Sequence, residues 1–154
     1  MGQSAEKYSD QSIEMATFYV GEALCGMDIL KVREVNKMLE MTNVPQAPDY
    51  VKGILNLRGQ IVTVIDLGKK MGLSVTNLSH DTRNIIVNSK NEYIGLLVDS
   101  IGDVERTDWD KVEPPPANIG GVQGKYFEGV FKTKNSLIGI LDVEEVLKEE
   151  VGKG

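Results

Sequence analysis

The segment VPQAPDYVKGILNLRGQIVTVIDL, residues 44–67, contains the strongest structural signals in the chain. Its β-branched run at 61–65 predicts a strand, because such side chains fit a pleated, half-buried surface. The four residues 56–59 have the composition of a turn, in which a glycine reverses the backbone without strain. Upstream, residues 50–52 are expected to form a short helix that Gly53 ends. The segment therefore predicts a β protein with short helical connections.

The same kinds of block occur twice along the chain. Three matched pairs follow in the same order: 26–35 with 95–104 at an offset of 69 residues, and 50–54 with 126–130 and 61–67 with 137–143 at an offset of 76. Any β protein can repeat an apolar run followed by an acidic helix cap. Three ordered matches nevertheless favour an internal duplication.

We therefore expect two similar β lobes, at about 12–72 and 83–151. Each has roughly 60–70 residues and is marginal as an independent unit, so the lobes should share a hydrophobic core. Short helices are expected at 67–71 and 143–151. The sequence leaves open whether terminal strands are exchanged between the lobes.

Size and charge exclude several classes of protein. The chain has 154 residues, 17 basic and 23 acidic, for a net charge of −6. An acidic chain is not expected to bind nucleic acid or an anionic membrane surface. Its most apolar windows, such as 61–65, are far shorter than the ~20 residues of a membrane-spanning helix. The polar residues 1–11 are expected to be a disordered tail, and 12–151 a single domain.

Few side chains suited to catalysis are present. One cysteine and one histidine cannot build a Cys/His zinc site, which needs about four ligands. Cys25 lies in an apolar run and is expected to be buried and inert, whereas His80 lies in a polar loop. The glycine-rich residues 120–125 lack phosphate-loop spacing, and Tyr126 follows where a hydroxyl residue is required. We expect no catalytic residue, no metal and no cofactor.

Three segments together resemble the CheW family of chemotaxis coupling proteins: 26–35, 44–67, and Val98-Asp99 following Gly95. The resemblance extends over about 13–147, with Thr63 standing where the family usually has proline. It implies two SH3-like five-stranded β-barrels packed on a common hydrophobic core. It also implies a non-enzymatic, cytoplasmic adaptor that is monomeric in isolation and is recruited to receptor arrays at the inner face of the membrane.

The resemblance also implies the partners. These are the cytoplasmic tip of chemoreceptors (methyl-accepting chemotaxis proteins) and the regulatory domain of the histidine kinase CheA, which the adaptor would bridge. The alternative is a small-ligand-binding or sensory β-barrel, which would present a concave polar pocket with convergent ionisable groups. A binding experiment with a receptor-tip fragment and the kinase domain separates the two hypotheses.

The resemblance assigns receptor-groove and coupling roles to Val32, Glu34, Gly53, Ile54, Leu57, Arg58, Gly59, Gly95 and Val98, and a kinase-facing edge to Ile29. Arg58 is expected to pair with Glu34, since a guanidinium forms forked bonds to a carboxylate. A plain surface pair, worth ~0–1 kcal/mol, is the alternative. Ile54, Leu57 and Val98 are expected to be apolar anchors of a groove between the lobes, with ordinary core positions as the alternative.

Overall fold

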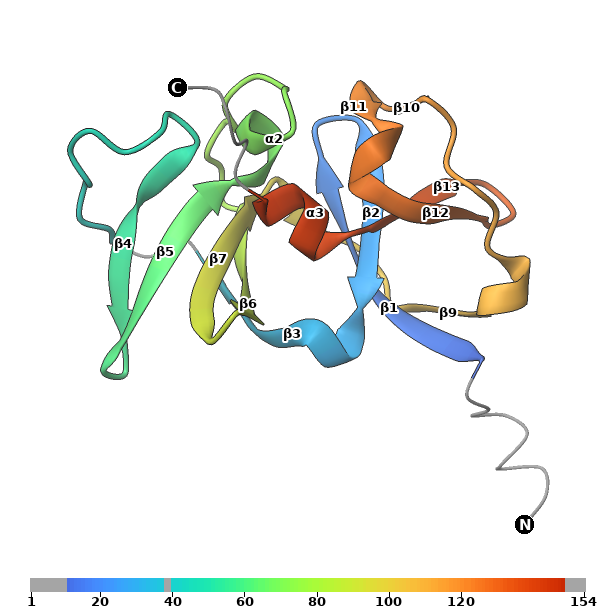
Figure 1. Ribbon diagram of the computed structural model, residues 1–154, viewed down its shortest axis with the longest axis horizontal. Helices are drawn as coiled ribbons and strands as arrows, with labels where there is room; N and C mark the ends of the chain where they lie inside the picture. Colours follow the sequence, from blue (N-terminus) through green and yellow to red (C-terminus); the bar gives the residue numbers. More distant parts are fainter. Residues whose placement is uncertain (1–10, 38–39, 149–154) are drawn as a thin grey trace, which may run out of the picture.

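The computed structural model describes residues 11–37 and 40–148, which form two β lobes lying side by side (Figure 1). One sheet, here called the terminal lobe, contains β1 (Ser12–Val20), β2 (Ala23–Asp28), β8 (Ser100–Ile101), β9 (Glu105–Asp108), β12 (Phe127–Lys132) and β13 (Leu137–Leu141). The other, the central lobe, contains β3 (Val32–Lys37), β4 (Val51–Leu57), β5 (Gln60–Asp66), β6 (Arg83–Ser89) and β7 (Glu92–Val98).

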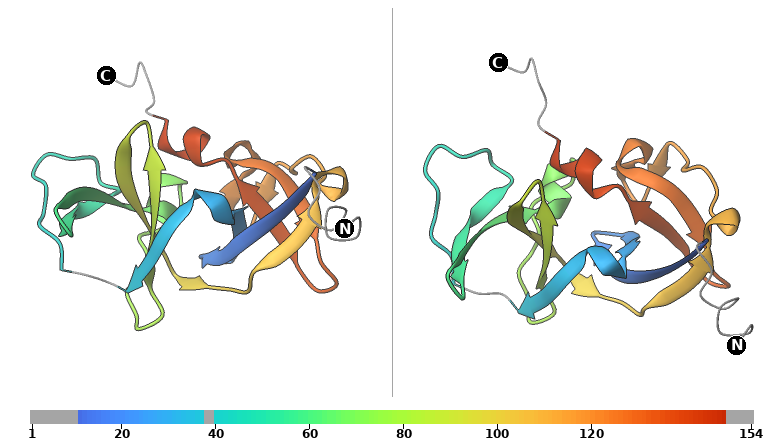
Figure 2. Two further views of the ribbon diagram at one scale, coloured as in Figure 1. Left: turned by 90° about the horizontal axis from the view of Figure 1, so that it is seen from below. Right: turned by 60° about the horizontal axis from the view of Figure 1, so that its bottom comes forward.

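Short elements connect these strands. They are the helices α2 (Leu67–Lys70) and α3 (Val143–Leu147), the 3₁₀ turns η1 (Ile29–Lys31), η2 (Trp109–Lys111) and η3 (Gly124–Tyr126), and the small hairpin β10 (Asn118–Ile119) and β11 (Val122–Gln123). Figure 2 shows β3 leaving the terminal lobe to join the central one. No helix among the described residues is both long and apolar enough to cross a membrane.

The two lobes repeat one strand arrangement, which confirms the duplication. The central sheet has the order β3-β6-β7-β5-β4, and the terminal sheet has β8/β9-β1-β2-β13-β12. In each, the third and fourth strands are parallel and the other neighbours antiparallel. Even the register irregularity of β4 at Val51/Gly53 has its counterpart in β12 at Phe127/Gly129, 76 residues later.

The sheets divide the chain differently from the expected ranges 12–72 and 83–151. The first two strands pair with strands from the second half of the chain, and β6 and β7 pair with β3 and β5. The reason lies in the parallel pairs β2–β13 and β5–β7, because parallel neighbours need a long crossover connection. Each half of the chain therefore contributes strands to both lobes.

Three hydrophobic clusters support this arrangement. The main one lies between the sheets and includes Phe18, Cys25, Met27, Ile85, Leu96, Val98 and Val146. A second, inside the central lobe, contains Leu55, Val62, Val64, Ile86 and Leu97. A third, inside the terminal lobe, contains Ile13, Met15, Ile138 and Ile140. The largest cluster is thus shared by the lobes, as their small size requires.

Two local predictions were wrong. Residues 50–52 do not form a helix, because β4 begins at Val51 and pairs with β5 along its length. Gly53 does not end a helix but lets β4 pass close to the backbone, since a Cβ there would lie 2.6 Å from Thr42 O. Gly26 does not interrupt its strand but lies in regularly paired β2. The strand breaks instead at η1, where Asp28 Oδ1 accepts a hydrogen bond from Leu30 N at 3.0 Å.

Two further features that the sequence predicts, a hairpin turn at 88–91 between two apolar runs and the starts of two helices, are confirmed. The turn between β6 and β7 contains Lys90 and Asn91, both with positive φ (53° and 66°), the conformation that two-residue hairpins favour. Helices α2 and α3 begin as expected, after the caps Asp66 and Asp142. Residues 1–10 of the expected tail and 149–151 of the expected final helix lie outside the described residues.

The two equivalent caps differ in burial, which leads to a prediction. Asp66 is fully buried and accepts bonds from Lys69 N, Thr76 N and Thr76 Oγ1, whereas Asp142 accepts, among the described residues, one bond, the capping bond from Glu145 N. We expect Asp66→Ala to lower the free energy of unfolding by about 2–4 kcal/mol, because buried donors lose their partner. Asp142→Ala should cost about 1 kcal/mol. Urea unfolding of both variants measures the difference, and equal losses would contradict it.

Candidate partner-binding site

The turn between β4 and β5 holds one arginine in a fixed position. Arg58 and Gly59 both have positive φ, 52° and 87°, so the two-residue turn follows the twist of its strands. Gly59 N donates to Asn56 Oδ1 at 2.8 Å, which closes the turn without using the guanidinium. The Arg58 side chain is 69% exposed. Its position is set by the backbone, and the side chain is available to a partner.

Arg58 pairs with Glu34, as the sequence predicted. Arg58 Nη2 donates to Glu34 Oε2, and the Glu34 side chain is 30% exposed. Glu34 lies on β3 and Arg58 follows β4, which are the two outer strands of the central sheet. The ion pair therefore joins the two edges of that sheet where it curls round.

A hollow of about 270 Å³, here called the central hollow, surrounds this ion pair. It is lined by Arg33, Glu34, Leu57, Arg58, Gln60, Val62, Ile86 and Tyr93. Val62 and Ile86 are buried and give it an apolar floor. The guanidinium carbon of Arg33 lies 5.9 Å from the centre of the Tyr93 ring. Cationic side chains thus stand at the rim of an apolar depression.

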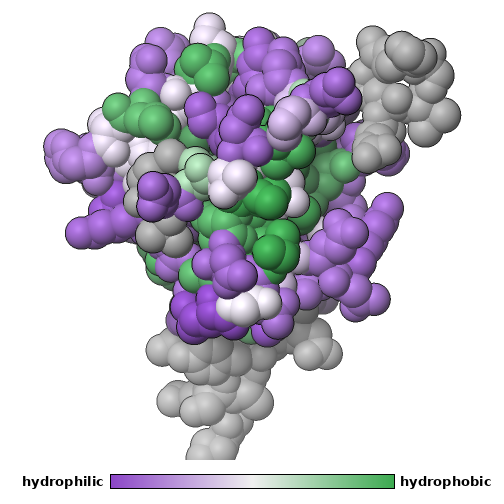
Figure 3. All heavy atoms as spheres, turned by 90° about the vertical axis from the view of Figure 1, so that its left-hand side faces the viewer, coloured by the Kyte–Doolittle hydropathy of each residue, from purple (hydrophilic) through white to green (hydrophobic). Residues whose placement is uncertain are grey.

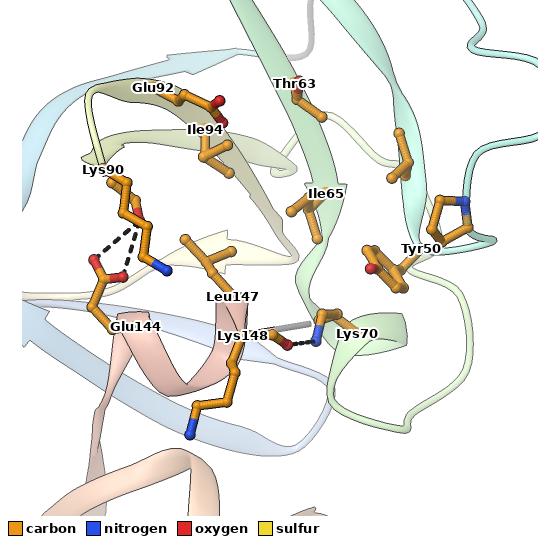
Figure 4. Close-up of a pocket in the computed structure, with 13 residues that line it drawn as sticks. Tyr50, Thr63, Ile65, Lys70, Lys90, Glu92, Ile94, Glu144, Leu147 and Lys148 are labelled. Carbon is orange, nitrogen blue, oxygen red and sulfur yellow. Dashed lines mark hydrogen bonds between the residues drawn. The ribbon is translucent and has the colours of Figure 1, made fainter. Parts of the chain in front are cut away.

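A larger groove of about 570 Å³ lies between α3 and the central lobe (Figure 4). Its apolar side chains include Val51, Ile65, Ile94 and Leu147, and its polar ones Thr63, Lys70, Lys90, Glu92, Glu144 and Lys148. Here it is called the inter-lobe groove, because α3 follows β13 of the terminal lobe.

Two polar contacts fix α3 beside this groove. Ser89 Oγ lies 3.1 Å from both carboxylate oxygens of Glu144 and donates to that group. Lys70 Nζ donates to Lys148 O at 3.3 Å. Lys70 Nζ also lies 5.1 Å from the centre of the Tyr50 ring. A helix bound in the groove would contact elements of both lobes.

The described residues offer little for nucleophilic or metal chemistry. Cys25 lies in the main core, and burial raises the pKa of its thiol to about 12, so it is protonated at neutral pH. The His80 side chain is 94% exposed and lies beside Asp81. Within 11–37 and 40–148, no three His, Cys, Asp or Glu side chains are grouped so as to hold a metal ion.

A family model for the CheW-like domain matches residues 14–151. The chain belongs to this family. It is 31% identical over 146 residues to a chemotaxis protein CheW of Treponema pallidum, covering 92% of this chain and 86% of that one. It is 29% identical over 147 residues to a chemotaxis protein CheW of Helicobacter pylori, covering 96% of this chain and 88% of that one.

The crystal structure of the scaffolding protein TtCheW from Thermoanaerobacter tengcongensis matches with a TM-score of 0.82 and 34% identity, covering 93% of this chain and 92% of that one. The mainly β, two-lobed fold is thereby confirmed.

In this CheW-like domain the expected site residues do not form one cluster. Glu34, Leu57 and Arg58 line the central hollow, and Gly59 shapes its turn. Val98 is fully buried in the main core. Its assignment as a groove anchor is therefore wrong, because β7 turns this side chain toward the terminal lobe.

The remaining expected residues lie elsewhere. Ile54 is half-buried on the edge strand β4 and pairs through its backbone with Thr42. Gly95 is buried, and a Cβ there would lie 3.3 Å from Val64 Cγ2, so its role is close packing. Val32 is half-buried at an irregularity of β3, and Ile29 is half-buried in η1, on the connection between the lobes.

Arg33 and Tyr93 in the central hollow were not predicted from the sequence, nor was most of the inter-lobe groove. The position of Tyr93 could have been predicted from the alternation of side chains along its strand. Tyr93 shares a face of β7 with the buried Leu97, while Ile94 lies on the opposite face. The docking of α3 had no comparable signal, since it depends on contacts such as that between Ser89 and Glu144.

The burial difference between Val98 and Arg58 predicts a large loss of stability at one position and almost none at the other. Val98→Asp should lower the free energy of unfolding by at least ~4 kcal/mol, because it places an unpaired carboxylate in the core. Arg58→Ala should change it by less than about 1 kcal/mol, the value of an exposed ion pair. Thermal melts of both variants measure this. A well-folded Val98→Asp protein would contradict the core assignment.

Proposed function

We propose that this CheW-like domain is a non-enzymatic adaptor that bridges chemoreceptor cytoplasmic tips to the regulatory domain of the histidine kinase CheA. Receptor state would thereby control kinase activity. The observation that carries the proposal is the Glu34–Arg58 pair, an exposed ion pair held on a rigid turn beside an apolar hollow. Such a pair adds little to folding, so its fixed geometry is available for binding. Family membership and the names of the similar proteins support the same function.

The receptor tip is proposed to occupy the inter-lobe groove. An amphipathic helix would place its apolar stripe against Ile65, Ile94 and Leu147, as in other helix-in-groove complexes. The groove differs from the one predicted from sequence, because Val98 takes no part in it. Figure 3 shows that apolar residues also gather on the face over β4 and β5, within a hydrophilic surround.

The kinase domain is proposed to contact the central hollow and the neighbouring edge at Ile29. Ile29 is half-buried, but the next residue, Leu30, is 86% exposed. An exposed leucine beside Ile29 adds apolar surface that a bound partner would bury. The net charge of −6 is compatible with a protein partner, in a cytoplasmic adaptor that is monomeric until it joins receptor arrays. No metal or cofactor is required for this role.

A double-mutant cycle tests the central hollow. Arg58→Ala should weaken assembly with receptor and kinase at least ~30-fold, because a truncated interface arginine can cost more than ~2 kcal/mol. Glu34→Ala should have a similar effect, and the double variant should lose less than the sum. The measurement is kinase activation in reconstituted receptor complexes, with melting curves as the folding control. Full activation by Arg58→Ala would overturn the role of this residue.

The inter-lobe groove is tested separately with Leu147→Asp. The carboxylate would be desolvated against the bound helix, so binding of a receptor-tip fragment should fall at least ~10-fold. Leu78→Asp is the matched control, since Leu78 is 52% exposed and lines neither the groove nor the central hollow. Calorimetric titration measures the binding of the receptor-tip fragment by both variants. Equal binding by the two folded variants would refute this location for the receptor helix.

A further inference from the structure

The terminal lobe carries a second hollow, of about 160 Å³, at the position equivalent to the central hollow. It is lined by Thr17, Tyr19, Leu24, Gly102, Asp103, Glu105, Thr133, Ser136 and Ile138. The offsets of 69 and 76 residues relate seven of the eight positions lining the central hollow to positions in this second one. Val62 corresponds to Ile138, for example, and Glu34 to Asp103. We call it the terminal hollow.

The two hollows differ in charge. The central hollow is lined by Arg33, Arg58 and Glu34. In the terminal hollow Gly102 stands at the position equivalent to Arg33, and the charged lining residues are the acidic Asp103 and Glu105. The duplicated backbone thus presents one hollow with a positive rim and one with a negative rim, in a chain whose net charge is −6.

Arg33 supplies the positive charge of the central hollow that no neighbouring carboxylate balances. Arg58 directs part of its guanidinium toward Glu34. Among the described residues, no carboxylate lies within ion-pair distance of Arg33, whose guanidinium carbon instead lies over the Tyr93 ring at 5.9 Å from its centre. The N–H groups of a guanidinium fit a carboxylate well. Arg33 is therefore oriented but not neutralised.

The floor of the central hollow indicates which kind of side chain should lie next to a carboxylate that pairs with Arg33. Val62 and Ile86 are buried, and Leu57 is half-buried at the same hollow. We propose that the central hollow receives a protein segment that pairs a carboxylate with Arg33 while an adjacent apolar side chain packs on this floor. The inference deepens the proposed function, on which it rests for the identity of the partner, by naming the chemistry of the segment that docks at Arg58.

The terminal hollow would reject the same segment. Asp103 and Glu105 would face its carboxylate with like charge, which disfavours the complex. The two lobes therefore present structurally equivalent positions to partners of opposite charge. Such a difference orders an assembly, because a partner that fits one lobe is repelled by the other.

A peptide titration tests the chemistry without the kinase. The probes are the blocked tripeptides Leu-Glu-Leu and Leu-Gln-Leu, which differ only in charge. In amide NMR spectra the Glu peptide should shift Leu57, Gly59 and Gln60, leave Gly102 and Asp103 in place, and bind at least ~5-fold more tightly than the Gln peptide. Equal responses to the two peptides, or shifts at the terminal hollow, would overturn the inference.

A second experiment uses the kinase regulatory domain and charge reversal. Arg33→Glu should weaken binding at least ~10-fold at low salt and flatten its salt dependence. Lys37→Glu is the matched control, because it makes the same charge change on the same strand at an exposed residue that does not line the hollow. Its effect should stay within about twofold.

The outcomes separate the two proposals. If Arg58→Ala abolishes kinase binding while Arg33→Glu and Lys37→Glu behave alike, the adaptor function stands and the carboxylate inference is wrong. If the unaltered protein does not bind the kinase domain, the proposed function fails. The peptide titration then still decides whether the central hollow selects a carboxylate.

Discussion

The main hydrophobic core belongs to both lobes, and the rest of the structure depends on this sharing. Phe18 and Met27 from the terminal lobe pack in the same cluster as Ile85 and Leu96 from the central lobe. A lobe of this size buries only ~60% of its surface when alone, so separation would expose the largest apolar cluster to water. Each half of the chain also contributes strands to both sheets, so the connections between the sheets add a topological constraint. The lobes are consequently held in one relative position, which fixes the shape of the inter-lobe groove.

Duplication explains how one backbone provides different surfaces. Many positions on the shared core are apolar in both copies, such as Met27 with Leu96 and Leu67 with Val143, whereas rim positions diverge. Arg33 has Gly102 as its counterpart, and Gln60 has Ser136. These rim residues contribute little to folding, since exposed side chains seldom change stability by more than about 0.5 kcal/mol. They can therefore vary in charge while the turn and the strands beneath them stay unchanged.

The strands, the helix caps, the duplication and the Glu34–Arg58 pair follow from the sequence, because each depends on local chemistry or on spacing. Residues 50–52 were misassigned because pairing with β5 outweighs a local helix signal, and a sequence alone does not show that pairing. Val98 was misassigned for a related reason. Alternation along β7 separates two faces, but both are apolar, so it does not indicate which one meets the other lobe. The inter-lobe groove arises from the docking of α3, a tertiary event without a local pattern.

The two proposed binding sites lie on opposite faces of the same strands. On β5, Val62 lines the central hollow and the adjacent Thr63 lines the inter-lobe groove; on β7, Tyr93 and Ile94 are divided in the same way. Successive residues of a strand point to opposite faces and share one rigid backbone. A displacement of β5 or β7 caused by an occupant of the groove therefore moves side chains at the central hollow directly. Coupling between receptor and kinase sites then requires no separation of the lobes, which the shared core opposes, but only a small shift within the central sheet.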